Sequence, residues 1–402
     1  MDYLTGNKKF NPTLLFGLLF AFLLAREISG DQYTGAEWET YMKMVQAFRN
    51  PDFGEDVNPV EAPHNGGFSW LYLALFHATK GGANVLLVQL IHAAVGVLNI
   101  MTVATIFYES GLPALALIPT FMNSRLRQIY ALDFLSDTWC VLFLHLAILY
   151  LAVYRKPLMG CLFYGLALTI HVGALYMLPG LLVVLVRGFS VKLAVRGIGV
   201  VLSLQVLANC VYTEVLPWFF LHMYRLPTIL KKPFASSVNY QFVLSETIYD
   251  SDNFGTALLC GTGVVWFLMW ALRWRTRALV SGQEDKRQVT ANMTLTLIES
   301  ILIGVVLTRS VEYRYLCWLV YAVPYSMSFT KLPKLARILP LLALRYGMDG
   351  TTFTPKTCGA VCVAFAAVLL GMLVFRDDKA DFTVKPKGGA TAPRRRKRRI
   401  NK

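Results

Sequence analysis

The sequence has little charge for its length. Of its 402 residues, only 16% are Asp, Glu, Lys or Arg, whereas 55% are hydrophobic. A soluble chain of this size needs more charge to cover its surface. No polar stretch is long enough to hold a separate core, and no internal repeat is clear. We therefore predict one membrane-embedded domain over residues 1–375, followed by a disordered basic tail over residues 376–402.

The sequence also lacks the usual motifs for metal binding and redox chemistry. Its seven cysteines are scattered, no two form a C-x-x-C pair, and no His lies at metal-ligand spacing. The first long polar loop contains no D-x-D motif. We therefore expect buried free thiols, no bound metal ion and no cofactor.

Apolar runs recur along the whole chain, and they do not alternate as the strands of a membrane barrel would. A helix needs about 20 mostly apolar residues to cross a bilayer. We predict an all-α polytopic membrane protein with about twelve transmembrane helices, of which the shortest are broken or tilted. The predicted spans are 12–28, 84–108, 112–122, 134–154, 158–171, 173–186, 197–216, 256–272, 291–308, 315–330, 337–347 and 359–375.

Lys and Arg residues in short loops predict the orientation, because they collect on the cytosolic side of a membrane protein. With twelve spans, every basic cluster falls on one side, together with both chain ends. The clusters are Lys8/Lys9, Arg155/Lys156, Arg187/Lys192/Arg196, Arg273/Arg275/Arg277, Lys331/Lys334/Arg337 and the basic tail residues Arg394 to Arg399. No good cleavage site follows the first apolar run, so we interpret it as a signal anchor.

The net charge of +15 comes largely from the tail, which carries eleven of the Lys and Arg residues. A solvated basic tail of this kind fixes topology and contacts anionic lipid headgroups. No aromatic residues are interleaved with the tail arginines, so we do not expect nucleic-acid binding.

The first lumenal loop, residues 29–83, is acidic in its first part. Its segment 35–45 predicts an amphipathic helix, because the residues of one face recur at spacings of three and four. That face consists of Trp38, Tyr41, Met42 and Val45. Glu37 lies beside Trp38 at the edge of the face. A simple alternative for the carboxylates of this loop is a solvated surface.

A second lumenal turn, residues 123–130, contains Arg125 and Arg127 and is followed by Asp133 and Asp137. Charged residues this close to apolar spans are costly unless they are paired or bind a ligand. Two arginines at i and i+2 can present guanidinium groups to a phosphate. An internal Arg–Asp pair that only joins helices is the alternative.

A third lumenal turn, residues 309–315, contains Arg309, Glu312 and Tyr313 and is also rich in ionisable groups. His171 lies between two half-length apolar runs on the same side, where a packed structural role is the alternative to a functional one. Acidic and cationic residues from these turns thus face one compartment. A carboxylate that accepts a proton and arginines that stabilise a departing phosphate suit an enzyme with a sugar–phosphate–lipid donor. The residues permit such an enzyme without singling it out.

At these same places the sequence resembles a known family, the dolichyl-phosphate-mannose-dependent α-1,3-mannosyltransferases of the endoplasmic reticulum. YTGAEWETYM (33–42) is similar to the family's Y-T-E-I-D-W-x-x-Y-M, and NSRLRQIYALDFLSD (123–137) to S-K-R-x-H-S-I-F-x-L-R-L-F-N-D. LPGLLVVL (178–185) resembles L-P-G-L-L, and VNYQFVLSE (238–246) resembles V-N-W-R-F-L-P-E-E. TRSVEYRYLCWLVYAVPY (308–325) is similar to S-R-S-L-H-Y-Q-F-Y-x-W-Y-x-x-x-L-P-Y. The five blocks occur in the family's order.

The sequence departs from the family pattern at several polar positions. Glu37 stands where the family has Asp, Arg127 where it has His, Asp133 where it has Arg, and Glu312 where it has His. The family's G-D-T-G-P-L-V-Y-P-A-G is reduced to VEAPHNGG, in which Glu61 takes the place of the Asp.

The resemblance implies an inverting glycosyltransferase of the GT-C type in the membrane of the endoplasmic reticulum, with its site on the lumenal side. The implied donor is dolichyl-phosphate mannose, and the implied acceptor is the five-mannose oligosaccharide on dolichyl diphosphate. By this resemblance Glu37 is the first candidate for the catalytic base and Glu61 the second. The expected contacts to the donor phosphate are Arg125, Arg127 and Arg309, with Asp137, Tyr313 and His171 in support. The alternatives are a related transferase with another acceptor or linkage, a lipid or sugar transporter, and a structural scaffold.

Overall fold

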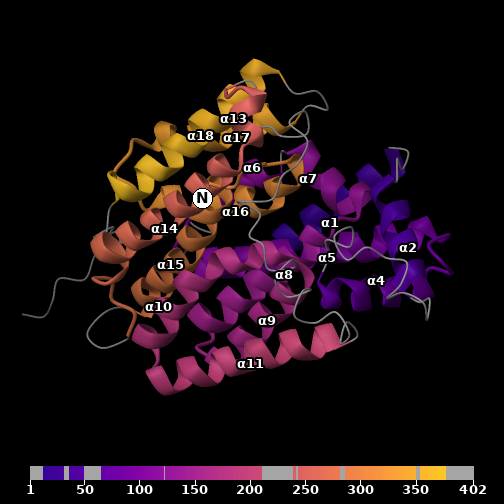
Figure 1. Cartoon of the computed structure of the whole chain (residues 1–402), viewed down its shortest axis with the longest axis horizontal. Helices are drawn as coiled ribbons and strands as arrows, with labels where there is room; N and C mark the ends of the chain where they lie inside the picture. Colours follow the sequence, from indigo (N-terminus) through magenta and orange to yellow (C-terminus); the bar gives the residue numbers. More distant parts are fainter. Residues whose placement is uncertain are drawn as a thin grey trace, which may run out of the picture.

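A computed structural model of the chain describes residues 12–30, 36–48, 65–121, 123–210, 239–240, 243–280, 286–349 and 354–376. These residues are helical almost throughout, and no β-strand occurs among them (Figure 1). The all-α prediction is therefore confirmed. The predicted tail lies outside the described residues except for Arg376, so the domain boundaries stay a prediction.

The α-helices are α1 (Thr13–Gly30), α2 (Ala36–Phe48), α4 (Gly66–Ala78), α5 (Val85–Glu109), α6 (Ile118–Phe121), α7 (Ser124–Gln128), α8 (Ser136–Ile148), α9 (Pro157–Ile170), α10 (Leu178–Gly188), α11 (Val191–Asn209), α13 (Glu246–Asp250), α14 (Asp252–Met269), α15 (Lys286–Val306), α16 (Leu316–Ser328), α17 (Lys334–Met348) and α18 (Pro355–Leu373). Short 3-10 helices are η1 (Ala114–Leu117), η4 (Val172–Met177) and η8 (Tyr313–Tyr315). Short π-helices are η2 (Ile129–Asp133), η3 (Leu149–Val153) and η7 (Trp270–Trp274).

Each of the twelve predicted spans overlaps helix, but only some of these helices have the length of a membrane span. Seven described helices are long and apolar enough to cross a membrane: Thr13–Gly30, Val85–Glu109, Ser136–Val153, Val191–Asn209, Asp252–Trp274, Lys286–Val306 and Pro355–Leu373. Two shorter apolar helices cover Pro157–Ile170 and Val172–Gly188. The structure thus supports a polytopic membrane protein without confirming a count of twelve.

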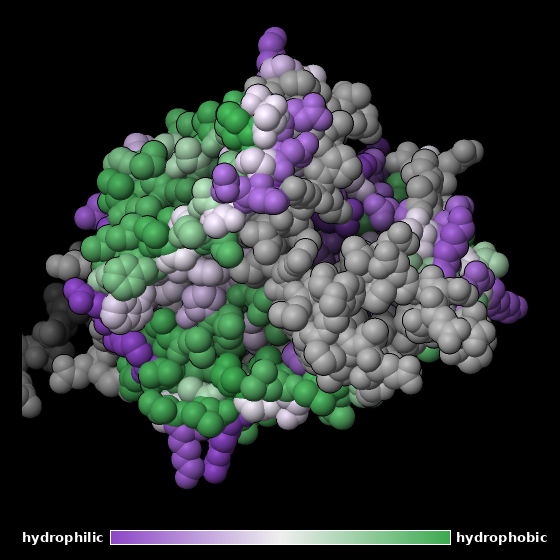
Figure 2. Space-filling view, viewed as in Figure 1, coloured by the Kyte–Doolittle hydropathy of each residue, from purple (hydrophilic) through white to green (hydrophobic). Residues whose placement is uncertain are grey.

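Helix α15 forms the centre of the described bundle, since 94% of its most apolar 18-residue stretch is buried inside the protein. Helices α1, α11 and α14 lie at the periphery, because only about a fifth of the most apolar 18-residue stretch of each is buried inside the protein. Their outward side chains are apolar, as Leu18, Val206 and Phe267 illustrate. Figure 2 shows such hydrophobic side chains in green over α14, α10 and α11. An apolar exterior of this kind suits contact with lipid chains.

The amphipathic helix predicted for residues 35–45 is confirmed as α2. All four residues of its predicted apolar face are at most 6% exposed. They pack on α4, whose aromatic run of Phe68, Trp70, Tyr72 and Phe76 was not predicted to be a helix. Tyr41 contacts the rings of Phe68 and Tyr72 at centroid distances of 5.1 and 4.9 Å. Aromatic packing thus fixes α2 on the body of the protein.

Polar contacts join several helix ends at the side of the molecule where α2 and α4 lie (Figure 1). Gly66, at the start of α4, donates its N–H to Asn209 Oδ1 at the end of α11, at 2.8 Å. Asn65 donates to the carbonyl of Leu168 near the end of α9, at 2.6 Å. These hydrogen bonds therefore hold the start of α4 against the ends of α9 and α11.

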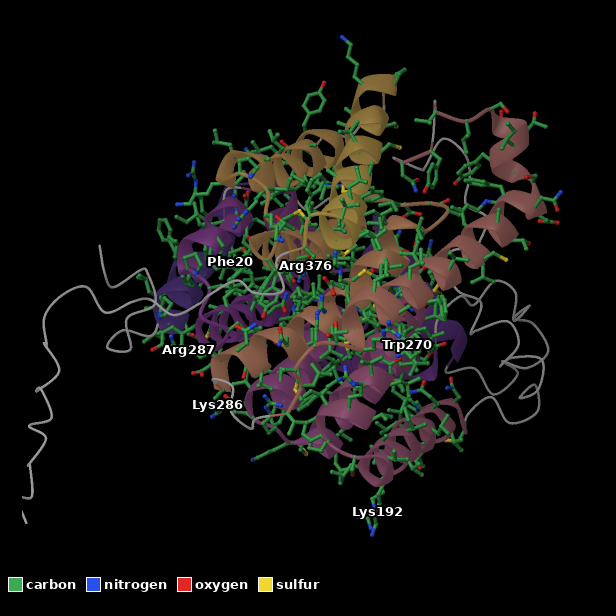
Figure 3. The ribbon with its side chains drawn as sticks, turned by 90° about the vertical axis from the view of Figure 1, so that its left-hand side faces the viewer. Phe20, Lys192, Trp270, Lys286, Arg287 and Arg376 are labelled. Atoms are coloured by element: carbon green, nitrogen blue, oxygen red, sulfur yellow. The ribbon has the colours of Figure 1, made fainter. Side chains whose placement is uncertain are left out.

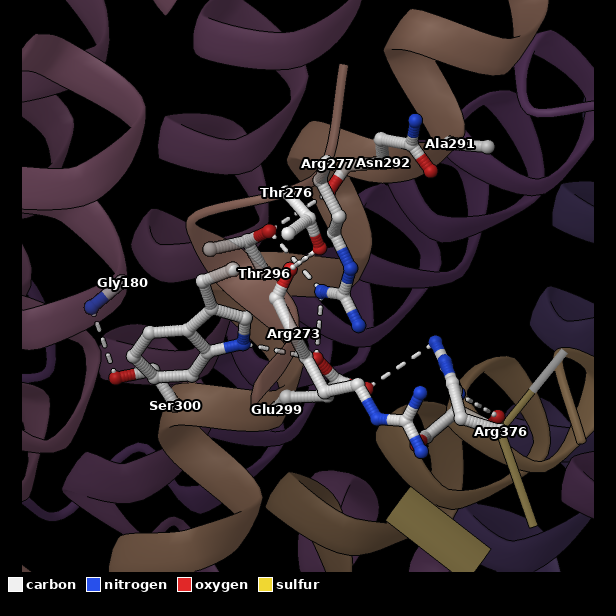
Figure 4. Close-up of polar contacts among 12 residues, drawn as sticks. Gly180, Arg273, Thr276, Arg277, Ala291, Asn292, Thr296, Glu299, Ser300 and Arg376 are labelled. Carbon is white, nitrogen blue, oxygen red and sulfur yellow. Dashed lines mark hydrogen bonds and ion pairs between the residues drawn. The ribbon is translucent and has the colours of Figure 1, made fainter. Parts of the chain in front are cut away.

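A second polar cluster surrounds Glu299 in the middle third of α15 (Figure 4). This carboxylate is fully buried and pairs with Arg277 at 2.6 Å and with Arg376 at 3.1 Å. It also accepts a hydrogen bond from Trp274 Nε1 at 3.0 Å. Figure 3 shows Arg376 inside the protein, whereas Lys192 extends into solvent. The cluster therefore ties the segments after α14 and α18 to the central helix.

Candidate active site

Helix α2 places Glu37 at the edge of its buried face. Trp38, the next residue, is 2% exposed and packs edge-on against Phe134 at a centroid distance of 5.8 Å. Its indole N–H donates to the carbonyl of Gly82 at 3.1 Å. The side chain of Glu37 is 39% exposed. The carboxylate is thus carried by a well-packed helix and remains accessible to a substrate.

The turn between η2 and α8 is shaped by Phe134, which has a φ of 52° in the left-handed region. A bulky residue adopts this conformation only where its surroundings enforce it. The ring of Phe134 is fully buried against Trp38 and His92, and its carbonyl accepts a hydrogen bond from Tyr72 at 2.7 Å. This turn ends η2 at Asp133 and begins α8 just before Asp137.

Arg314 in η8 lies between two carboxylates. Its Nε is 2.8 Å from Glu312 Oε2, and its Nη2 is 3.4 Å from Glu37 Oε1. Burial lowers the pKa of Arg314, but nearby ionisable groups outweigh that effect, so the pKa is raised above its ordinary value. In decreasing order of effect these groups are Glu312, Asp137, Tyr41 and Glu37. The guanidinium is therefore charged at any physiological pH.

Arg125 lies over the ring of Tyr313, with its guanidinium 4.1 Å from the centroid of that ring. It donates to Gln128 Oε1 at 3.1 Å and is 3.9 Å from Asp133. Burial raises the pKa of Asp133 above its ordinary value, although Arg125 opposes the shift. Burial also raises the pKa of Tyr313 to about 12, so its hydroxyl is neutral.

Asp137 forms the buried wall of the site at the start of α8. It is fully buried, and its Oδ1 accepts a hydrogen bond from Trp318 Nε1 at 2.9 Å. His171 Nε2 is 3.8 Å from the same oxygen, and His171 Nδ1 accepts the N–H of Gly173 at 3.0 Å. His171 is therefore oriented by its own backbone turn, with Nε2 toward Asp137. Asp137 Oδ2 has no hydrogen-bond partner among the residues that the structure describes.

The other two arginines of the sequence prediction have partners of their own. Arg127 Nε pairs with Glu27 Oε1 at 2.5 Å, and its Nη1 donates to the carbonyl of Phe121 at 2.9 Å. Arg309 is 1% exposed and donates to the carbonyls of Ser251, at 3.0 Å, and Tyr249. In this structure Arg127 thus joins α7 to α1, and Arg309 joins the third turn to α13 and α14.

The structure brings the three predicted turns together around Tyr313. Of the predicted site residues, Glu37, Arg125, Asp137, Tyr313 and His171 belong to this cluster, whereas Glu61 lies outside the described residues. Arg314 and Trp318 were not among the residues predicted for the site. The position of Arg314 directly after Tyr313, in a short turn rich in ionisable groups, was the available signal.

The resulting site combines a partly exposed carboxylate with two guanidinium groups. Four carboxylates, Glu37, Asp133, Asp137 and Glu312, face Arg125 and Arg314. Within the described ranges, no three His, Cys, Asp or Glu side chains are grouped so that they can hold a metal ion. The geometry thus offers a proton acceptor beside donors for an anionic group, which is the set required for displacement of a phosphate leaving group.

Comparison with known proteins gives one family. The family model described as "ALG3 protein" matches residues 14–356. An Arabidopsis thaliana protein named Dol-P-Man:Man(5)GlcNAc(2)-PP-Dol alpha-1,3-mannosyltransferase is 24% identical over 379 residues, which cover 88% of this chain and 85% of that protein. The Homo sapiens protein of the same name is 26% identical over 378 residues, covering 84% and 81%. The Cryptococcus neoformans protein of that name is 23% identical over 385 residues, covering 85% and 83%. No solved structure matches the chain significantly.

Proposed function

Because the chain belongs to the ALG3 protein family, we propose that it transfers mannose from dolichyl-phosphate mannose to the five-mannose oligosaccharide on dolichyl diphosphate, in α-1,3 linkage. The observation that carries the proposal is the extent of the match. It runs from α1 into α18 and includes every segment of the polar cluster around Tyr313. Curated relatives with this activity in their names are covered over more than four fifths of their length.

The reaction is a single displacement with inversion at the anomeric carbon. Glu37 takes the proton of the acceptor hydroxyl while the hydroxyl oxygen forms a bond to C1 of mannose. The bond from C1 to the phosphate oxygen breaks, and its electron pair leaves with dolichyl phosphate. Its partial exposure and its place on the rigid helix α2 suit Glu37 for this role. Glu61 remains the second candidate.

Arg125 is the contact to the donor phosphate that the geometry favours. Its Nε has no hydrogen-bond partner among the described residues, and the ring of Tyr313 holds its guanidinium in place. Arginine suits phosphate because its planar fork donates two parallel hydrogen bonds. For Arg127 and Arg309, phosphate contact requires that they exchange their present partners. Asp137 and His171 support the site from its buried side.

We further propose that the chain lies in the membrane of the endoplasmic reticulum with about twelve spans, both ends in the cytosol and the site in the lumen. The helix formed by α8 and η3 supports this two-sided arrangement. It runs over 18 residues, about 27 Å, from the site at Asp137 to the turn before Arg155. Arg155 donates to the carbonyl of Leu279 at 3.4 Å, in a region where the predicted cytosolic arginines gather.

The test is a lipid-linked oligosaccharide profile from cells that lack the gene. We expect the five-mannose species to accumulate, and the normal profile to return when the gene is restored. The same cells carrying the Glu37→Gln variant should keep the block. A profile that is unchanged, or that stalls at a longer species, would contradict the proposed acceptor.

A further inference from the structure

Arg314 has a geometry that the proposed function does not yet explain. Its guanidinium pairs with two carboxylates, through Nε with Glu312 and through Nη2 with Glu37. Nη1 makes no hydrogen bond or ion pair within the part of the chain that the structure describes. One cation therefore reaches the candidate base and still has a nitrogen available for another anion.

The two pairs of Arg314 are unequal. The pair with Glu312 is 2.8 Å long, and the side chain of Glu312 is 12% exposed. The pair with Glu37 is 3.4 Å long, and the side chain of Glu37 is 39% exposed. Ion pairs that are longer and more exposed contribute less, because water competes for both partners. The pair with Glu37 is thus the one that an incoming anion can replace.

The neighbouring cation, Arg125, also faces a carboxylate, but at a distance too long for a hydrogen bond. Arg125 is 3.9 Å from Asp133 and stacks on Tyr313, the residue directly before Arg314. A phosphate that reaches this site therefore meets guanidinium groups that already face carboxylates. Contact with Arg125 breaks no hydrogen bond to a carboxylate, whereas contact with Nη2 of Arg314 requires that the hydrogen bond to Glu37 be exchanged.

We propose that the phosphate of the donor takes the place of Glu37 on Arg314, so that donor binding releases the catalytic base. This inference rests on the proposed function and adds a residue to it. Before the donor binds, Arg314 holds Glu37 and limits unproductive proton transfer. After it binds, Glu312 keeps Arg314 in position while Nη1 and Nη2 hold the phosphate.

The exchange fits the bond changes of the reaction. Released Glu37 accepts the proton of the acceptor hydroxyl as that oxygen bonds to C1 of mannose. The electron pair of the broken C1–O bond passes to the phosphate, which then carries one more negative charge than in the donor. Arg314 lies beside the oxygen on which this charge develops, where a fixed cation stabilises the transition state.

Binding of dolichyl phosphate, the leaving group, tests the exchange without requiring catalysis. The full chain is reconstituted in lipid nanodiscs, transfer of mannose by the wild type is established, and dissociation constants for dolichyl phosphate are then measured. Loss of a partly exposed ion pair predicts that Glu37→Gln binds about two- to fivefold more tightly than the wild type. Arg314→Gln should bind more weakly, and the Glu37→Gln/Arg314→Gln double variant should match Arg314→Gln.

Glu39→Gln is the matched control, because Glu39 is an exposed carboxylate on the same turn of α2. It should leave the affinity for dolichyl phosphate within twofold of the wild type (about 0.4 kcal/mol at 298 K). Equal tightening by Glu39→Gln, or tightening by Glu37→Gln that persists without Arg314, would show simple charge repulsion and overturn the exchange. If Arg314→Gln does not fold, Arg314→Met, which also removes the charge, replaces it, with Glu37→Gln again expected to lose its effect. A wild type that transfers no mannose refutes the proposed function instead.

Discussion

The most direct test of the site is replacement of Glu37 by Gln, which keeps the shape of the side chain and removes its ability to accept a proton. General-base catalysis contributes about 10²- to 10⁴-fold. We therefore expect the rate of mannose transfer to fall at least 100-fold, which corresponds to about 2.7 kcal/mol in the activation free energy. Transfer is measured with dolichyl-phosphate mannose and the five-mannose acceptor in membranes that contain equal amounts of the two proteins.

The structure predicts that this loss of activity occurs without loss of folding. Glu37 is 39% exposed, and its ion pair with Arg314 is 3.4 Å long. Such a pair contributes about 0.2–1 kcal/mol, so the thermal midpoint should shift by only a few degrees. Glu39→Gln provides the control and should retain activity. Near-normal transfer by Glu37→Gln would remove Glu37 from the mechanism, and loss of transfer by Glu61→Gln would then identify the second candidate as the base.

Three further predictions concern the groups around the site and the buried cluster. Arg125→Ala should raise the donor KM about 10- to 100-fold, as expected when a charged hydrogen-bond donor is lost, and should change the acceptor KM little; equal changes in both constants would contradict a phosphate contact. Because burial raises the pKa of Asp133, the stability associated with its neutral form is lost as pH rises through that pKa. The thermal midpoint of Asp133→Asn, relative to that of the wild type, should therefore increase as the pH is raised. Parallel curves of thermal midpoint against pH for the two proteins would refute this. Glu299→Ala leaves two buried arginines without their carboxylate and should destabilise the protein by about 3–5 kcal/mol, seen as a low yield of folded protein; a normal yield would show that the cluster is dispensable.

Helix α2 was predictable because its signal is local. Trp38, Tyr41, Met42 and Val45 recur at helical spacing, and all four are buried in α2. Burying such a face requires only that some apolar surface be available, so the pattern alone predicts the helix and its orientation. The partner surface, α4, was not predicted as a helix, since its aromatic run is equally typical of a membrane interface.

The number of spans was less predictable, because hydropathy reports burial in lipid and burial in protein alike. Helix α16 is 13 residues long, and all but two of them are buried inside the protein. Helix α6, within the predicted span 112–122, has four residues. An apolar segment that packs against other helices needs no fixed length, whereas one that crosses a bilayer alone does. Short apolar runs therefore support helix without establishing a crossing.

The candidate site could be predicted as a set of turns but not as a set of contacts. The sequence places α2 and residues 123–137 and 309–315 on one side of the membrane. This placement predicts that the three segments meet. Which arginine reaches Glu37 depends on how η8 turns between α15 and α16, and the turn presents Arg314 and not Arg309. That choice is made by tertiary packing, which no single segment encodes.

Ion pairs between Arg and Glu serve two different purposes in this chain, and burial separates them. Glu299 is fully buried between arginines that are at most 5% exposed, so neither partner can leave without stranding a charge in a dry interior. Glu37 is partly exposed, so water or a substrate can take its place on Arg314 at little cost. The first arrangement suits a permanent joint between helices, and the second suits a contact that must open in each catalytic cycle. Loss of Glu299 should therefore be visible in the yield of folded protein, and loss of Glu37 in the chemistry of a protein that folds normally.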